Sequence, residues 1–335
     1  MPSMRDFVLF FGEKEGTSAM VRWADRLEGV SVVHHDNGRG WEPLEAHLLG
    51  RDLRLEEVST LFSLIYSKPR DMAALRRAYA VKRPDRTLVS LPETGSVGLK
   101  MRWRPPDVFH CGYGLVDLPV NRLFREMRRS RHFAAMTEQM AAHDVVPMMA
   151  ARQDIFRWAL SKYHGSGSGK KGHLQFKLAS GEIERGDIPK VHVHLRKFGR
   201  LVDQCRRLHE SKRELAEALR ALGLSVKPLL YEDFLEDKVA FFEDFLESLG
   251  HAVRPGQVHS MLEGAINLQR VHTGPLSDYV ENAVELERAF GGAWEEWSSD
   301  WIGEPPHRVD DHGQDVHPIE GASPDSELVE SESLR

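Results

Sequence analysis

The stretch FVLFFGEKEGTSAMVRW, from Phe7 to Trp23, decides the fold that we expect. The continuous apolar run Phe7–Phe11 ends at Gly12, which is the pattern of a buried strand in a parallel sheet. A short polar loop with one lysine follows, and Gly16, Thr17 and Ser18 then open a segment with helical spacing. A strand, a glycine-containing loop and a helix N-terminus in this order form a common type of anion-binding site.

The same alternation of strand and helix continues outward from this stretch. Further strands are predicted at Val30–His34, Ser96–Trp103, Val145–Ala150 and Ser225–Leu230. Helices are predicted at Ser18–Leu27, Glu42–Leu49, Glu56–Tyr66, Asp71–Val81, Val120–Arg131, His132–His143, Asp154–Tyr163, Ile188–Leu222, Asp237–Leu249 and Leu276–Phe290. This order predicts the α/β class, with a central parallel sheet flanked by helices, in one domain over residues 1–301.

Composition limits the classes of protein that the chain can represent. Its 335 residues carry a formal net charge of −6, which disfavours a nucleic-acid-coating protein. No secretory signal and no long apolar segment are visible, and Cys111 and Cys205 lie far apart, so we expect a cytoplasmic protein without a membrane span. Residues 302–335 are acidic and poor in aromatic side chains, which predicts a disordered tail. The sequence leaves homo-oligomerisation open.

The loop from Gly12 to Ser18 has two interpretations. In the first, backbone N–H groups of Gly16, Thr17 and Ser18 bind an anion and Lys14 adds a full positive charge. In the second, the loop is an ordinary turn in which Thr17 or Ser18 caps the helix. It is not the nucleoside-triphosphate loop G-x-x-x-x-G-K-[ST], because no Lys-Ser or Lys-Thr pair follows the second glycine.

Two further cations lie at or near strand ends. Arg152 follows the strand Val145–Ala150, and its planar guanidinium suits a phosphate, although it could instead pair with Asp154. Ser161 lies further along the helix that follows. Lys100 stands inside an apolar strand, where it must meet an anion, extend its ammonium group to solvent, or belong to an edge strand.

The remaining candidates are a glycine-rich segment and several histidines. HGSGSGKKG, residues 164–172, follows a predicted helix rather than a strand and is interpreted as a flexible linker. His192 and His194 lack a third ligand at a recognisable spacing, so we expect no metal site. His34 and His35 follow the second strand and are candidate general bases.

Taken in order, these segments resemble the sulfotransferases that use 3′-phosphoadenosine-5′-phosphosulfate, and most of all the bacterial trehalose-type enzymes. The resemblance spans about Phe7 to Phe290. It rests on KEGTS at Lys14–Ser18, GLKMRW at Gly98–Trp103, Arg152 with Asp154 and Ser161, LLYEDFLEDKVAFFEDFLESLG at Leu229–Gly250, and LQRVHTGPLSDYVENAVEL at Leu268–Leu286.

The resemblance implies a P-loop-like sulfotransferase fold and a set of residue roles. Lys14, Gly16, Thr17 and Ser18 would hold the 5′-phosphosulfate, and Arg152 and Ser161 the 3′-phosphate. The acceptor would be a small molecule or a glycan, and the enzyme would need no metal.

Two features depart from the family pattern. Glu15 stands where the family usually has serine, so it would weaken donor binding or point into solvent. The base is also open among His34, His35, Asp36 and Glu42, with His35 as the first choice because a histidine titrates near neutral pH. Lys14 and Lys100 would neutralise the charge of the transition state.

Two alternatives of different class remain at the level of the sequence. A small-molecule kinase would use a similar sheet, but the missing Lys-Ser or Lys-Thr pair speaks against it. A catalytically weak nucleotide-binding module is motivated by the carboxylate of Glu15 beside the expected anion.

Overall fold

The computed structural model describes most of the chain between residues 4 and 290. The described residues are 4–35, 54–81, 86–103, 119–167, 181–184, 186, 188, 190–254, 256–263 and 274–290, with the backbone only at 119–130 and 165–167. The predicted helix Glu42–Leu49, the base candidates Asp36 and Glu42, the cysteine Cys111 and the predicted tail 302–335 lie outside these residues.

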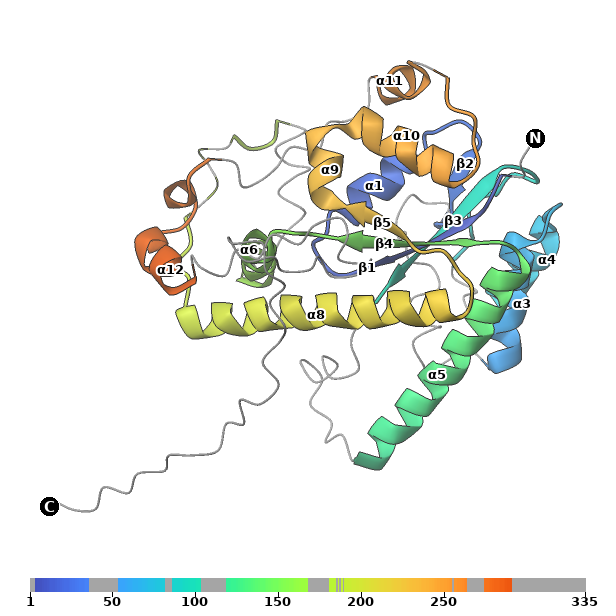
Figure 1. Ribbon diagram of the computed structural model, residues 1–335, viewed down its shortest axis with the longest axis horizontal. Helices are drawn as coiled ribbons and strands as arrows, with labels where there is room; N and C mark the ends of the chain where they lie inside the picture. Colours follow the sequence, from blue (N-terminus) through green and yellow to red (C-terminus); the bar gives the residue numbers. More distant parts are fainter. Residues whose placement is uncertain are drawn as a thin grey trace, which may run out of the picture.

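A five-stranded parallel sheet forms the centre of the molecule, which confirms the predicted α/β class (Figure 1). The strand order is β2-β3-β1-β4-β5. The strands are β1 Phe7–Phe11, β2 Val30–Val32, β3 Ser96–Arg102, β4 Val146–Ala151 and β5 Lys227–Leu230. From β1 the chain passes to the edge strand β2 and back to β3 on one side, and then to β4 and the edge strand β5 on the other. The sheet therefore changes winding direction between β1 and β4, where the carboxyl ends of parallel strands commonly bind ligands.

Helices cover both faces of the sheet (Figure 1). They are α1 Thr17–Ala24, α3 Leu55–Tyr66, α4 Met72–Ala80, α5 Pro119–Ala142, α6 Ile155–Gly167, α8 Leu195–Ala221, α9 Tyr231–Glu236, α10 Lys238–Ser248, α11 Gln257–Leu262 and α12 Ala283–Phe290, with a 3₁₀ turn, η3, at Leu276–Asp278.

The apolar run of β1 is explained by burial on both faces. Val8 and Phe10 pack with α3, α4, α5 and the C-terminal half of α8. Phe7, Leu9 and Phe11 pack on the opposite face with α1, α10 and α11. Because side chains alternate along a strand, a central strand covered twice must be apolar at every position.

A third apolar cluster lies beyond the C-terminal edge of the sheet. It joins α6 to the N-terminal half of α8, η3 and α12. Phe156 and Phe198 meet there with ring centroids 5.3 Å apart. The long helix α8 thus packs under the sheet with one half and against α6 with the other.

Four predicted element boundaries were wrong. Residues 119–142 form one continuous helix without the break expected near Ser130, because a serine costs a helix only a few tenths of a kcal/mol. α6 continues through Gly167, so the first residues of the predicted linker are helical.

The predicted helix Leu276–Phe290 is divided into η3 and α12. Between them, Val280 forms a bridge with Val191, and the Asn282 side chain bonds the backbone N–H and C=O of Val193 at 2.9 and 3.0 Å. The same pairing keeps Val191 extended, so α8 starts at Leu195 and not at Ile188 as predicted.

Candidate functional site

The loop between β1 and α1 lies at the C-terminal edge of the sheet. Gly16 precedes α1 with φ 75°, in the left-handed region, and no side chain caps the helix, so the expectation of a Thr17 or Ser18 cap was wrong. Within the described chain, no acceptor takes the N–H groups of Gly16, Thr17 and Ser18. Free N–H groups at a helix N-terminus, with the positive end of the helix dipole, are the elements of an anion site.

Gly16 is required here for space as well as for its backbone angle. A Cβ on this residue would lie 2.3 Å from the ring of Tyr231, the first residue of α9. The aromatic ring therefore lies directly against the loop backbone. A left-handed φ and this contact together explain why the position between Glu15 and Thr17 is a glycine.

Lys100 reaches the same loop from β3. Its side chain is on the α1 face of the sheet and is almost fully buried, with 2% exposure. The ammonium Nζ donates to Ser18 Oγ at 3.2 Å and lies 4.1 Å from the ring centroid of Phe11. Since β3 lies between β2 and β1, the interpretation as an edge-strand lysine was wrong.

Arg152 reaches the loop from the other side, at the end of β4. Its Nη1 donates to the carbonyl oxygen of Lys14 at 3.4 Å, and its guanidinium lies 4.8 Å from the ring centroid of Tyr231. Its buried Nε has no hydrogen-bond partner among the described residues. The structure gives Asp154 another role, since its carboxylate pairs with Arg157 at 3.3 Å and caps α6 at the Arg157 N–H.

The other predicted residues on this edge are placed less closely together. Lys14 is exposed with φ 67°, at the tip of the loop. Ser161 lies nearly two turns along α6 and is half-buried. The structure thus brings Lys14, Lys100 and Arg152 to one loop, whereas Ser161 joins them only through the helix that follows Arg152.

Glu15 does not point into solvent and does not face the anion position. Its side chain is fully buried, forms an ion pair with Lys212 of α8, and accepts a hydrogen bond from the Gly12 N–H. Burial raises the pKa of Glu15 and lowers that of Lys212, and the opposite charge of each partner counteracts both shifts. The expectation that Glu15 opposes an anion in the loop was therefore wrong, because Lys212 balances its charge.

The remaining loop carboxylate also has a partner. Glu13 Oε1 accepts from Arg102 Nη1 at 2.6 Å, and the Glu13 carbonyl accepts from Trp158 Nε1 at 2.6 Å. The two acidic residues beside Lys14 are thus each paired with a cation. They do not cancel the positive charge of the loop.

The two candidate histidines follow β2, and both contact protein groups. His34 Nε2 lies 3.7 Å from the carboxylate of Asp25. His35 is buried, with Nε2 2.7 Å from Tyr79 Oη and Nδ1 3.3 Å from Arg86 Nη1. Because an arginine only donates, Nδ1 of His35 is an acceptor and Nε2 carries the proton in this arrangement.

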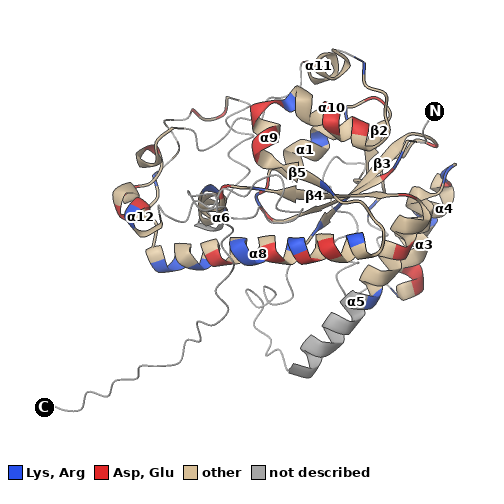
Figure 2. Ribbon diagram, in the orientation of Figure 1, with Lys and Arg blue, Asp and Glu red and all other residues tan. Residues whose placement is uncertain are grey.

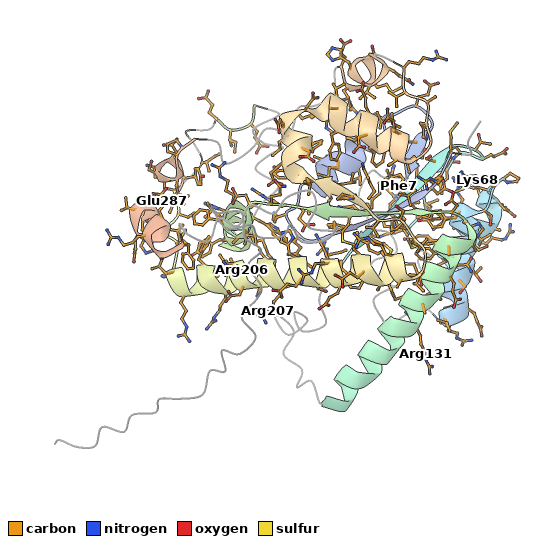
Figure 3. The ribbon with its side chains drawn as sticks, in the orientation of Figure 1. Phe7, Lys68, Arg131, Arg206, Arg207 and Glu287 are labelled. Atoms are coloured by element: carbon orange, nitrogen blue, oxygen red, sulfur yellow. The ribbon has the colours of Figure 1, made fainter. Side chains whose placement is uncertain are left out.

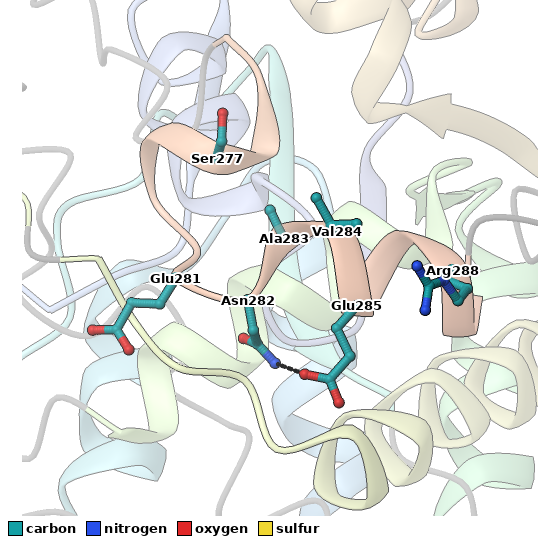
Figure 4. A pocket seen from close by; sticks show the side chains of 7 residues that line it. All are labelled: Ser277, Glu281, Asn282, Ala283, Val284, Glu285 and Arg288. Atoms are coloured by element: carbon teal, nitrogen blue, oxygen red, sulfur yellow. Dashed lines mark hydrogen bonds between the residues drawn. The ribbon is translucent and has the colours of Figure 1, made fainter.

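Metal ligands are not clustered in the described part of the chain. No cluster of three or more His, Cys, Asp or Glu residues occurs there, and no helix there is long and apolar enough to span a membrane. An open hollow of about 400 Å³ lies beside α12 (Figure 4). In it, Asn282 Nδ2 donates to Glu285 Oε2 at 3.1 Å, and the lining carries charges of both signs, from Glu281, Glu285 and Arg288.

Sequence reasoning missed the turn of α8 from Leu208 to Lys212. Figure 2 shows Lys and Arg interspersed with Asp and Glu along this helix. Such a charge pattern in the sequence predicts a helix exposed to solvent. His209 and Lys212 are nevertheless fully buried against the site. The only sequence signal was that both positions lie on the apolar side of the helix, in register with Leu208, Leu215 and Leu219.

Comparison of the chain with protein-family models finds no match, and comparison with curated proteins finds none either. Among solved structures, the chain is similar to the crystal structure of sulfotransferase STF9 from Mycobacterium avium. The TM-score is 0.35 and the sequence identity 13%, and the match covers 89% of this chain and 78% of that chain. A likeness at this level carries no argument, so the functional proposal rests on the geometry of the site.

Proposed function

We propose that this protein is a sulfotransferase, which transfers a sulfonate group from 3′-phosphoadenosine-5′-phosphosulfate to a hydroxyl of a carbohydrate or another small acceptor. One observation carries the proposal: two cations approach the β1–α1 loop from the strands on either side of β1. Lys100 comes from β3 and Arg152 from β4, and both contact loop residues. A site with free N–H groups and convergent cations suits a donor with several anionic groups.

The donor would lie across the switch between β1 and β4. Its 5′-phosphosulfate would accept from the N–H groups of Gly16, Thr17 and Ser18, with Lys14 and Lys100 as counter-charges. Arg152 would hold the 3′-phosphate with the part of its guanidinium that the described residues leave unsatisfied at Nε. Ser161 stays the predicted second ligand of that phosphate.

The reaction would be an in-line displacement at sulfur. The acceptor oxygen forms the new bond to sulfur, the bond from sulfur to the phosphate oxygen breaks, and the bisphosphate leaves with the extra negative charge. Lys14 and Lys100 would stabilise that charge as it develops, which is the type of contribution that a preorganised cation makes in an active site.

His35 stays the predicted general base, and the structure adds a condition. Its Nδ1 accepts from Arg86 at 3.3 Å, so the imidazole takes the acceptor's proton only after this contact opens. Asp36 and Glu42, which lie outside the described residues, are the alternatives. The pH dependence of kcat tests the assignment. If kcat of the His35→Gln variant still falls at acid pH as in the parent, the base is one of these carboxylates.

Of the two alternatives, the weak binding module loses its motivation. It rested on a repulsive Glu15, whereas the Glu15 carboxylate pairs with Lys212. A kinase would prefer ATP, so competition between ATP and adenosine 3′,5′-bisphosphate separates the two enzyme classes.

The decisive experiment is a calorimetric titration with adenosine 3′,5′-bisphosphate and with AMP. We expect the bisphosphate to bind more tightly, and Arg152→Ala to remove about 1.5–3 kcal/mol of that preference, the value of a hydrogen bond to a charged group. Arg157→Ala is the matched control, because Arg157 pairs with Asp154 rather than with the loop. Equal affinities of the parent protein for the two nucleotides would contradict the proposal.

A further inference from the structure

One turn of α8, Leu208–Lys212, contacts the residues that follow β1 and β4. A Cβ on Gly12 would lie 2.4 Å from Leu208 Cδ2, so the helix lies directly against the start of the loop. His209 Nε2 bonds the carbonyl oxygen of Arg152 at 2.9 Å. Burial and the charge of Lys212 lower the pKa of His209 to about 3, so the imidazole is neutral and Nε2 donates.

The same turn also contacts β3 and the interior of β4. Ser211 Oγ accepts from Trp103 Nε1 at 3.0 Å, directly after β3. Lys212 Nζ donates to the carbonyl oxygen of Ala150 at 2.6 Å. A single helical turn is therefore in contact with the ends of β1, β3 and β4, the three strands that carry the candidate site.

Lys212 adds a contact to the loop itself through its buried ion pair with Glu15. Both side chains have 0% exposure. The Glu15 carboxylate accepts from Gly12 N–H with its other oxygen. The chain of contacts thus runs from β4 through the ammonium to the carboxylate and on to the first residue of the loop.

We infer that Lys212 is a positioning residue, which fixes the β1–α1 loop in its anion-binding shape through Glu15. The identity of the ligand in this inference rests on the proposed function. The effect of Lys212 on the order of the loop does not depend on it. Lys212 contacts Glu15 of the loop and Ala150 of β4, so its effect on the loop passes through Glu15 to Gly12.

Stability alone does not explain why such a pair is present. Two buried charges lose their hydration, and an apolar pair of similar size is often equally stable or better. A buried ion pair does, however, fix geometry, since each charge has one low-energy place in the interior. This property is useful at a loop whose N–H groups must converge on one point.

The test compares three variants: Glu15→Gln, Lys212→Met and the double variant with both changes. The matched control is Lys227→Met with Asp244→Asn, which removes an exposed pair between β5 and α10 at 2.6 Å. Three quantities are measured: the unfolding temperature, the affinity for adenosine 3′,5′-bisphosphate, and hydrogen exchange of the amides at 12–18.

Each single variant leaves a buried charge without its partner, and we expect its unfolding temperature to fall by about 10 °C. The double variant removes both charges, so its unfolding temperature returns to within a few degrees of the parent. Its loop amides nevertheless exchange about tenfold faster than in the parent, and its affinity for the bisphosphate falls about tenfold, as for the loss of one hydrogen bond to a charged group. The control pair changes neither loop exchange nor affinity.

A double variant with parental loop exchange would overturn the inference, because the pair would then only fill space. The sulfotransferase function and the positioning role of Lys212 can be refuted independently of each other. If the parent does not bind the bisphosphate, the sulfotransferase proposal is wrong, and exchange at 12–18 still decides the role of Lys212.

Discussion

At the scale of single residues, Lys100 occupies a place that is unfavourable for a lysine. It lies in a central strand with 2% exposure, and its contacts include the Ser18 hydroxyl and the ring of Phe11. Burial of an ammonium group costs free energy because the charge loses its hydration. A buried lysine at the carboxyl end of a parallel sheet is a candidate for contact with an anionic ligand.

Lys100→Met tests that interpretation. Methionine keeps the length of the side chain and removes the charge, so we expect an unfolding temperature equal to or above that of the parent. Sulfonate transfer should fall by about 10²–10³, the scale of one preorganised electrostatic contact. Thermal unfolding and single-turnover transfer from the phosphosulfate donor measure the two effects.

The control for this variant is Lys227→Met, since Lys227 pairs with Asp244 far from the loop. A Lys100→Met protein that is strongly destabilised and fully active would mean that the lysine serves only the folded structure. It would remove Lys100 from the proposed site.

At the scale of elements, α1 begins in an unusual way. Gly16 stands before its first residue with φ 75°, and the ring of Tyr231 covers the position of a Cβ. α11 begins with the same backbone geometry at Gly256, with φ 76°, but nothing lies within 4 Å of a Cβ there. A comparison of alanine variants at the two glycines therefore separates two contributions to the free energy of unfolding: the unfavourable backbone angle, present at both, and the contact with Tyr231, present only at Gly16.

We expect Gly256→Ala to cost about 1–2 kcal/mol of the free energy of unfolding, the penalty of a left-handed angle for a residue with a Cβ. Gly16→Ala should cost about 1–3 kcal/mol more, because the methyl group must displace Tyr231. Gly16→Ala should also weaken binding of adenosine 3′,5′-bisphosphate, whereas Gly256→Ala should not. Denaturant unfolding and calorimetry measure these differences, and equal costs at the two positions would show that Tyr231 moves away freely.

At the scale of the whole molecule, one end of the sheet holds a buried ion-pair network and the other end holds the candidate site. The amino end, near Phe7 and Lys68 in Figure 3, holds a buried ion pair between Asp6 and Arg70 at 2.6 Å. Asp6 also accepts from the Val97 N–H, and Arg70 donates to the carbonyl oxygens of Ile65 and Pro92, so this network ties the strand starts to the segment after α3. The candidate site lies at the opposite, carboxyl end.

Arg70→Met should therefore affect stability without affecting binding. It leaves Asp6 buried, and the remaining cation near it among the described residues is the partly exposed Lys68 at 3.5 Å, so we expect a loss of about 3–5 kcal/mol. Affinity for adenosine 3′,5′-bisphosphate, measured well below the unfolding temperature, should stay within about twofold of the parent. Lys68→Met is the control, and we expect it to have a small effect on both the free energy of unfolding and the affinity. A large loss of affinity in Arg70→Met would contradict the prediction and show that the two ends of the sheet are coupled.

Much of the fold follows from local patterns. The apolar runs at β1 and β4 required burial on both faces, and helical spacing identified α1, α3, α4 and α10 close to their observed bounds. Two of the wrong boundaries, the division of Leu276–Phe290 and the start of α8, have a common cause. The division at Asn282 depends on its contacts with Val193, 89 residues earlier in the chain, which no local pattern contains.

The sequence by itself determined the class of the fold, the position of the loop after β1, and the cations Lys14, Lys100 and Arg152 as candidates, because strand and helix periodicity and strand ends are local properties. Only the tertiary structure decided the environment of these charges. It placed Lys100 in a central strand and paired Glu15 with Lys212, a residue 197 positions away. The same carboxylate that the sequence suggests as repulsive to an anion is neutralised in the folded protein, because the partner of a buried charge is chosen by packing and leaves no periodic signal in the chain.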